Sequence, residues 1–172
     1  SGPQIGLVNF MTNTHPMRNA ADVDSYLARM DQVAVRLDEA LVRAKGAAAK
    51  QMIPPRFILE RAQFQVDHFL KPSAAENVFV TSLTERSAGL KDLTPEARSA
   101  AIARATKIVE TKVRPAYARV QAFMAEIHPA TTDVAGISRL PNGAAAYARA
   151  LENFTSTKLT ADQIHMIGLR EV

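Results

Sequence analysis

The sequence contains no cysteine and no tryptophan, and only 6% of its residues are aromatic. Without cysteine there is neither a disulfide scaffold nor a cysteine-based zinc site or nucleophile. The absence of cysteine does not determine the cellular compartment, because cysteine-free chains suit both the cytosol and the periplasm. No apolar run is long enough to span a bilayer, and no signal peptide is recognisable. Ser1 and Gly2 are compatible with a cloning remnant, in which case the natural start lies upstream.

Charge of one sign is not concentrated anywhere in the chain. The 21 lysines and arginines exceed the 17 aspartates and glutamates and give a net charge of +4, but the two signs alternate. Such a pattern is typical of solvated helix surfaces. No aromatic side chains are interleaved with basic ones, so we expect no nucleic-acid partner.

The composition favours helices. Hydrophobic residues make up 47% of the chain, and many of them are alanine, which has the highest helix propensity and little area to bury. Residues 1–172 are therefore predicted to form one all-α domain or lobe, an irregular multi-helix bundle that belongs to a larger helical protein.

Apolar spacing and capping residues predict the individual elements. The predicted helices run from about 20 to 49, from the Pro54–Pro55 pair to 70, weakly within 73–89, and from Thr94 to 127. The apolar stripe of the last continues in phase past Pro115, so we expect one long helix kinked at that proline rather than two helices.

The remaining segments are predicted to be less regular. Residues 1–18 are expected to be an irregular lead-in, whose apolar stretch packs as a strand or a single helical turn, and residues 129–142 a loop. A short helix follows over 143–153. A capping box at Thr160 starts a final helix that is marginal at two turns, which indicates that the natural chain continues beyond it.

No complete catalytic set is recognisable. The four histidines are His15, His68, His128 and His165, and no two have the i, i+4 spacing of a His-Glu-x-x-His zinc motif. Glycine-rich phosphate loops, nucleophile elbows and paired Glu-x-x-His sites are also absent. The histidines fit helix surfaces and helix ends as well as they fit ligands.

One stretch, residues 139–168, gathers a tyrosine, several small hydroxyls and a histidine around a tight turn. These side chains could hydrogen-bond a substrate. They could equally cap helices and turns, which serine and threonine commonly do.

At this stretch the sequence resembles a known family. Leu140-Pro-Asn-Gly-Ala-Ala-Ala-Tyr147, Phe154-Thr-Ser-Thr157 and Leu159-Thr-Ala-Asp-Gln-Ile-His165 are similar to the signature of the bacterial domain-of-unknown-function family 885. Upstream, Thr14-His-Pro-Met-Arg-Asn-Ala-Ala-Asp-Val-Asp-Ser-Tyr-Leu27 and Val113-Arg-Pro-Ala-Tyr117 fit the family too. Ala146, Ser156 and Ala161 stand where it tends to have tyrosine, threonine and proline.

The resemblance implies a function that residue patterns alone do not. Family members resemble zinc peptidases and carry their metal motif further downstream, so zinc is implied for the parent protein and no metal or cofactor for this chain. The chain would be an N-terminal lobe that is inactive alone. Its partners would be the rest of its parent chain and a peptide substrate. By resemblance, Tyr147, Thr155, Thr157 and His165 are expected to line the substrate.

Two alternatives remain open at this point. The chain could be a non-catalytic helical module for protein interaction, because broad apolar stripes accompany the missing catalytic set. A lipid- or surfactant-sensing helical protein is a weaker idea, since the polar faces give it no support. The compartment is not determined, although related bacterial proteins are often periplasmic or exported.

Overall fold

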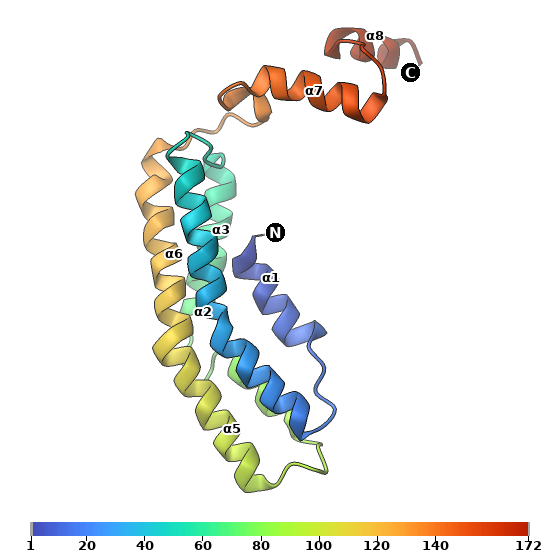
Figure 1. Cartoon of the computed structure of the whole chain (residues 1–172). Coiled ribbons are helices and arrows are strands. Elements are labelled where there is room, and N and C mark those ends of the chain that lie inside the picture. Colours follow the sequence, from blue (N-terminus) through green and yellow to red (C-terminus); the bar gives the residue numbers. More distant parts are fainter. Residues whose placement is uncertain (1, 172) are drawn as a thin grey trace.

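A computed structural model of the chain describes residues 2–171, and its helices form a long bundle with an arm at one end (Figure 1). No strand occurs among the described residues, so the all-α prediction is confirmed. The elements are α1 (Pro3–Asn9), η1 (Phe10–Thr14), α2 (Ala20–Ala48), α3 (Arg56–Leu70), α4 (Val78–Ser87), α5 (Pro95–Ile108), η2 (Val109–Val113), α6 (Arg114–Ile127), η3 (His128–Ala130), η4 (Ile137–Arg139), α7 (Gly143–Thr155) and α8 (Ala161–Glu171).

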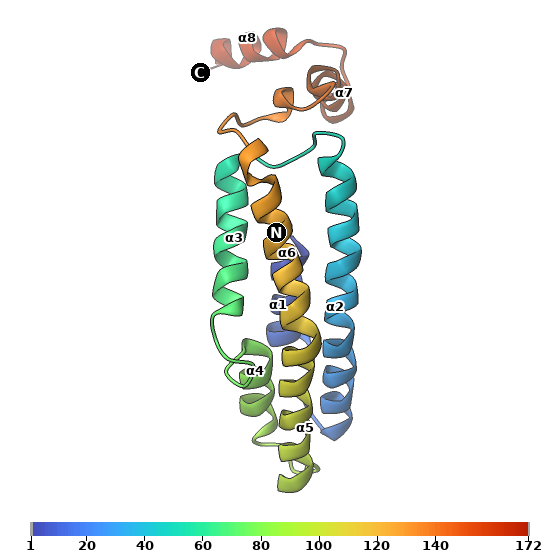
Figure 2. The same ribbon diagram turned by 90° about the vertical axis from the view of Figure 1, so that its left-hand side faces the viewer.

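Three columns of helix make up the bundle (Figure 2). One column is α2, the second is α3 followed by α4, and the third is α5, η2 and α6 in line; α1 packs beside them. Asn19 caps α2 by accepting a hydrogen bond from the Asp22 amide at 2.9 Å. The buried stripe of α2 repeats at helical spacing, as its sequence predicts, and consists of Val23, Tyr26, Leu27, Met30, Val33 and Leu37.

In the second column, the capping-box pattern at Ser73 forms its hydrogen bonds but does not start a helix. Ser73 and Glu76 form the reciprocal hydrogen bonds of a capping box, with the Ser73 hydroxyl donating to the Glu76 carboxylate at 2.7 Å. They close a turn, however, and α4 begins later, at Val78. Its cap is Asn77, a buried side chain that accepts from the Phe79 amide and donates to the Phe69 carbonyl.

The third column is continuous across Pro115, as predicted. The π-helical turn η2 comes directly before α6, and there the Arg114 amide donates to the Val109 carbonyl, five residues back. A proline lacks the amide hydrogen and crowds the preceding turn, so a wider turn at this point accommodates it. Figure 1 shows the axis bending between α5 and α6.

The core lies where the columns and α1 meet. Tyr117 of α6 is fully buried and stacks on Phe69 of α3, with ring centroids 3.9 Å apart. Its hydroxyl donates to the Gln4 carbonyl of α1 at 2.7 Å. Burial raises the pKa of Tyr117 well above its ordinary value, so the phenol stays neutral and continues to donate.

The prediction of an irregular lead-in over residues 1–18 is wrong for most of that segment. Residues 3–14 form α1 and the π-helical η1, and only the residues from His15 to α2 are irregular. Met11 is buried in the core. The end of η1 is held by Arg86 of α4, whose guanidinium donates to the carbonyls of Met11, Thr12 and His15.

The side chain of His15, whose carbonyl accepts a hydrogen bond from Arg86, is fully buried. Its Nδ1 is 2.6 Å from the Pro16 carbonyl oxygen, so Nδ1 carries the proton. Nε2 is buried and has no hydrogen-bond partner among residues 2–171. The ring meets Tyr26 edge-on. Burial lowers the pKa of His15, and the positive charges of Arg29 and Arg86 lower it further.

This geometry predicts acid sensitivity. Because the pKa of His15 is lower in the folded chain than its ordinary value of 6.5, the unfolded chain binds more protons below that pH. The free energy of unfolding should therefore fall as the pH drops through 6.5, by at most about 1.4 kcal/mol per pH unit, until the folded pKa is passed. Urea denaturation at pH 8 and pH 5.5 measures this. His15→Asn, which keeps an N–H for the Pro16 carbonyl, should have a weaker pH dependence; equal slopes would contradict the assignment.

None of the described helices combines the length and the apolarity that crossing a bilayer needs.

Candidate functional site

The arm, defined here as residues 137–171, consists of η4, α7 and α8 and projects past the end of the bundle (Figure 1). Its only buried residue is Gly143. Apolar side chains are correspondingly open to solvent, and Phe154 is 90% exposed. The other exposed large apolar residues of the arm are Ile137, Tyr147, Leu159, Met166, Ile167 and Leu169. Helices of this length that bury so little are marginal alone, so the arm is a surface suited to contact with other groups.

A compact turn fixes the start of α7. The Leu140 amide donates to the Ile137 carbonyl at 3.0 Å, and the Gly143 amide donates to the Leu140 carbonyl at 2.8 Å. Asn142 adopts a left-handed conformation with φ of 57°, which asparagine tolerates better than most residues. The Leu-Pro-Asn-Gly sequence therefore has a structural role that local chemistry explains.

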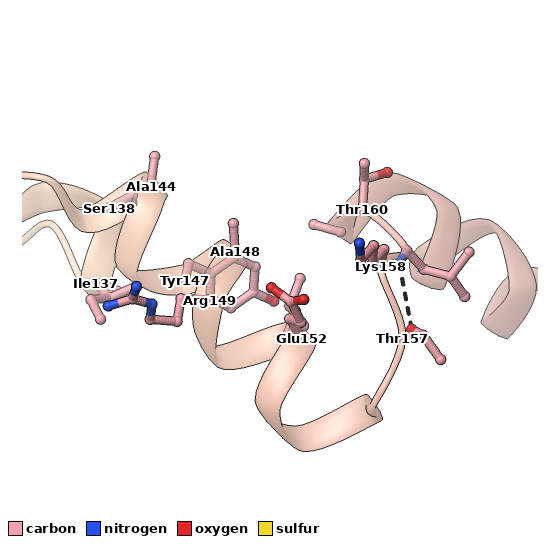
Figure 3. A pocket seen from close by; sticks show the side chains of 14 residues that line it. Ile137, Ser138, Ala144, Tyr147, Ala148, Arg149, Glu152, Thr157, Lys158 and Thr160 are labelled. Atoms are coloured by element: carbon pink, nitrogen blue, oxygen red, sulfur yellow. Dashed lines mark hydrogen bonds between the residues drawn. The ribbon is translucent and has the colours of Figure 1, made fainter.

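A hollow of about 900 Å³ lies against α7 and the turn that leads into α8 (Figure 3); we call it the arm hollow. One face of α7 supplies residues at helical spacing: Ala144, Tyr147, Ala148, Leu151 and Glu152. Residues 157–161 form the opposite side, and residues 136–138 also line it. Small alanines at the start of α7 leave room beside the tyrosine ring.

Threonine hydroxyls shape the turn between α7 and α8. The Thr155 hydroxyl donates to the Leu151 carbonyl at 2.7 Å and lies 2.9 Å from the Thr157 hydroxyl. The Thr157 hydroxyl accepts in turn from the Leu159 amide. Ser156 is left-handed, with φ of 54°, and ends α7. A reciprocal box between Thr160 and Gln163 starts α8, as the sequence predicts.

The structure brings two of the four predicted site residues together. Tyr147, 48% exposed, and Thr157 both line the arm hollow. Thr155 is not among the lining residues, and its hydroxyl instead holds the turn that presents Thr157. His165 is exposed on α8, outside the lining. The substrate role of all four stays a prediction.

Sequence reasoning overlooked three charged residues of the arm hollow: Arg149, Glu152 and Lys158. Glu152 could have been found, because it follows Ala144 and Ala148 at intervals of four on the face that carries Tyr147. Lys158 could not, because it reaches the hollow only through the reversal at Ser156. Figure 3 shows Glu152 on α7 and Lys158 across from it.

These groups are suited to binding rather than to a complete reaction. The arm hollow offers a phenol, threonine hydroxyls, one carboxylate and two cations, which match the polar groups of a peptide. No hydrogen bond found among its described residues joins a hydroxyl to a histidine or a carboxylate, the arrangement that activates a nucleophile. Across residues 2–171, no three potential ligands among histidine and carboxylate side chains converge as a metal site. The described residues therefore offer no set of ligands that fits a zinc ion.

Comparison with known proteins gives a family and a similar solved structure. A family model described as "Bacterial protein of unknown function (DUF885)" matches residues 1–172. No curated protein matches the chain. A crystal structure described as that of "the putative lipoprotein from Colwellia psychrerythraea" is 26% identical, with a TM-score of 0.89. The match covers 99% of this chain but 29% of that one, so this chain spans less than a third of its solved relative's length.

Proposed function

Because the chain belongs to the bacterial family of unknown function DUF885, we propose that it is the helical N-terminal lobe of a larger zinc-dependent, peptidase-like hydrolase. In this proposal the arm lines the substrate cleft, and residues downstream of the arm hold the metal. The observation that carries it is the arm hollow, where Tyr147, Glu152 and Thr157 face an open space of peptide-binding size.

The exposed apolar side chains of the arm support the proposal that another part of the same polypeptide covers it. Phe154 and Leu169 are 90% and 59% exposed, and apolar side chains of this size are normally covered. The solved relative is more than three times as long as the part that matches. We propose that the rest of the parent chain covers the arm and completes the cleft. The relative's description as a lipoprotein supports an exported, periplasmic or surface-held location.

The reaction class is tested with the full-length, zinc-loaded protein and a panel of short chromogenic peptides. Turnover that is lost on chelation and restored by zinc is expected. Absence of turnover across the panel would overturn the hydrolase assignment.

Removal of single hydroxyls tests the placement of the substrate. Tyr147→Phe and Thr157→Val should each lower kcat/KM about tenfold, because each removes one hydrogen bond to a bound peptide. Thr111→Val is the matched control, since the Thr111 hydroxyl donates to its own helix at Lys107, far from the arm along the bundle. Loss of activity in His165→Ala together with full activity in Tyr147→Phe would show that the substrate lies outside the arm hollow.

A non-catalytic interaction module is the second candidate, favoured by the same exposed apolar side chains. The variant Phe154→Ser of the full-length protein distinguishes the interaction module from the hydrolase lobe. If the arm is covered within one polypeptide, this change should lower the melting temperature of the isolated protein. If the arm binds a different protein, the melting temperature should stay unchanged and the complex should be lost.

A further inference from the structure

The arm meets the bundle at residues 49–55, the segment that connects α2 to α3 (Figure 1). There the Arg139 guanidinium of η4 donates to the Ile53 carbonyl at 2.6 Å. It is the only hydrogen bond found among the described residues that links the arm to the bundle. α7 packs on η4, and neither α7 nor α8 packs extensively on a described helix of the bundle. The position of the arm therefore depends on few contacts.

The Ile53 carbonyl that accepts this hydrogen bond lies in a rigid segment. The Met52 amide donates to the Ala47 carbonyl at 3.0 Å, which is one of the hydrogen bonds of a Schellman motif at the end of α2. Gln51 has the left-handed φ, here 60°, that this motif requires. Pro54–Pro55 follow directly, and their rings fix φ. The acceptor is thus held from both sides along the chain.

The chain that leads into the arm is tied to the bundle only up to Asp133. The Arg56 amide, at the start of α3, donates to the Thr132 carbonyl at 2.9 Å, which satisfies a donor that has no partner within its own helix. The Arg56 guanidinium lies 3.5 Å from the Asp133 carboxylate. Residues 134–138 are exposed, and no hydrogen bond found within residues 2–171 joins them to the bundle.

Within this exposed stretch, Gly136 has a φ of 92° and a ψ of 157°, a conformation that residues with a Cβ atom rarely adopt. Ile137 and Ser138 come next and line the arm hollow, whereas Arg139 does not. A rotation about Gly136 would therefore carry the arm hollow with it. The hydrogen bond of Arg139 opposes that rotation, because it holds the residues just beyond Gly136 on the bundle.

We propose that the arm is hinged at Gly136 and latched to the bundle by Arg139, so that the latch determines where the arm hollow lies. A guanidinium that donates to a carbonyl forms one of the stronger hydrogen bonds of a protein, and breaking this one exposes none of the bundle's core. A hollow of about 480 Å³ adjoins the latch, so side-chain packing does not enclose Arg139 on every side. Arg139 is thus a positioning residue, whatever reaction the arm hollow serves.

Distances between two nitroxide labels in the full-length protein test the latch. Val42→Cys on α2 and Asn153→Cys on α7 supply the labelling sites, because both residues are exposed and residues 1–172 contain no cysteine. One narrow distance distribution is expected. Arg139→Ala should broaden it, since the lost hydrogen bond raises the unlatched fraction roughly tenfold. Arg170→Ala, at an exposed arginine of α8, is the matched control and should leave the distribution unchanged.

The hinge is tested with Gly136→Ala in the same labelled protein. Alanine avoids a φ of 92°, and its Cβ would meet only the Ser138 hydroxyl, at 3.8 Å, so the backbone rather than the space available resists the change. The mean distance between the labels should shift. An unchanged mean distance overturns the hinge. An unchanged distribution in Arg139→Ala overturns the latch, as does equal broadening in Arg170→Ala. Urea denaturation should show that the bundle of each variant is as stable as that of the wild type; a destabilised bundle in Arg139→Ala also overturns the proposal.

Discussion

Replacing Gly143 with alanine is expected to displace the start of α7 and to destabilise the arm by about 3 kcal/mol. A Cβ atom on Gly143 would lie 1.9 Å from the Ile137 carbonyl oxygen and 3.0 Å from the Ser138 Cα. Both are backbone atoms, so no side-chain rotation relieves the clash, and either η4 or α7 must move. Ile137, Ser138 and Tyr147 all line the arm hollow, so its shape changes with them.

Hydrogen exchange of residues 137–148 in the full-length protein measures this effect. A loss of about 3 kcal/mol accelerates exchange through local opening roughly a hundredfold. Gly168→Ala is the control within the same arm, because no atom lies within 4 Å of its added Cβ. Alanine should stabilise α8 there by up to about 1 kcal/mol. If the two variants exchange alike, the close approach at Gly143 does not determine the arm's structure.

Removal of the Arg86 side chain is the second change with a large expected effect. Arg86→Ala should lower the free energy of unfolding by about 3 kcal/mol, because a charged donor is lost from three carbonyl groups. Two of its hydrogen bonds, to Met11 and Thr12, are 3.1 Å long, and the third goes to His15. These carbonyls lie at the end of η1, where no further turn of helix supplies a donor.

Urea denaturation of the full-length protein and its variants measures the loss. Arg86→Lys should be intermediate, since an ammonium cannot reach three carbonyls as the planar guanidinium does. Arg104→Ala, an exposed arginine of α5, is the control and should be close to neutral. Equal stability of the Arg86→Ala and Arg104→Ala variants would mean that packing alone holds the N-terminal segment.

The best sequence predictions were those whose cause lies within a few residues. Thr94 and Thr160 each cap the helix that follows, because a cap needs only a side-chain oxygen and an amide two or three residues later. The same local signal at Ser73 formed its hydrogen bonds without starting a helix. There, Asn77 is held by the Phe69 carbonyl of the preceding helix, a tertiary contact that the capping pattern does not contain.

The part of the candidate site that lies on one helix was predictable from the sequence, and the part that depends on the turn after it was not. Tyr147 and Glu152 share a face of α7 because of helical spacing alone. Whether Thr155, Thr157 or His165 shares a space with them depends on the path of the chain through Ser156, which the residue types do not determine.

The sequence by itself determined the helical class, the α2 stripe and the continuity of the long helix through Pro115, since periodicity and caps act locally. Tertiary structure alone decided three features. The end of the helical lead-in is held by Arg86, which lies more than 70 residues away in the sequence. An apolar space is left between α2, α3 and α6 because α1 begins partway along the bundle. The arm projects past the end of the bundle and buries Gly143 alone. Whether a helical face is covered depends on contacts between distant segments, which leave no periodic signal in the sequence.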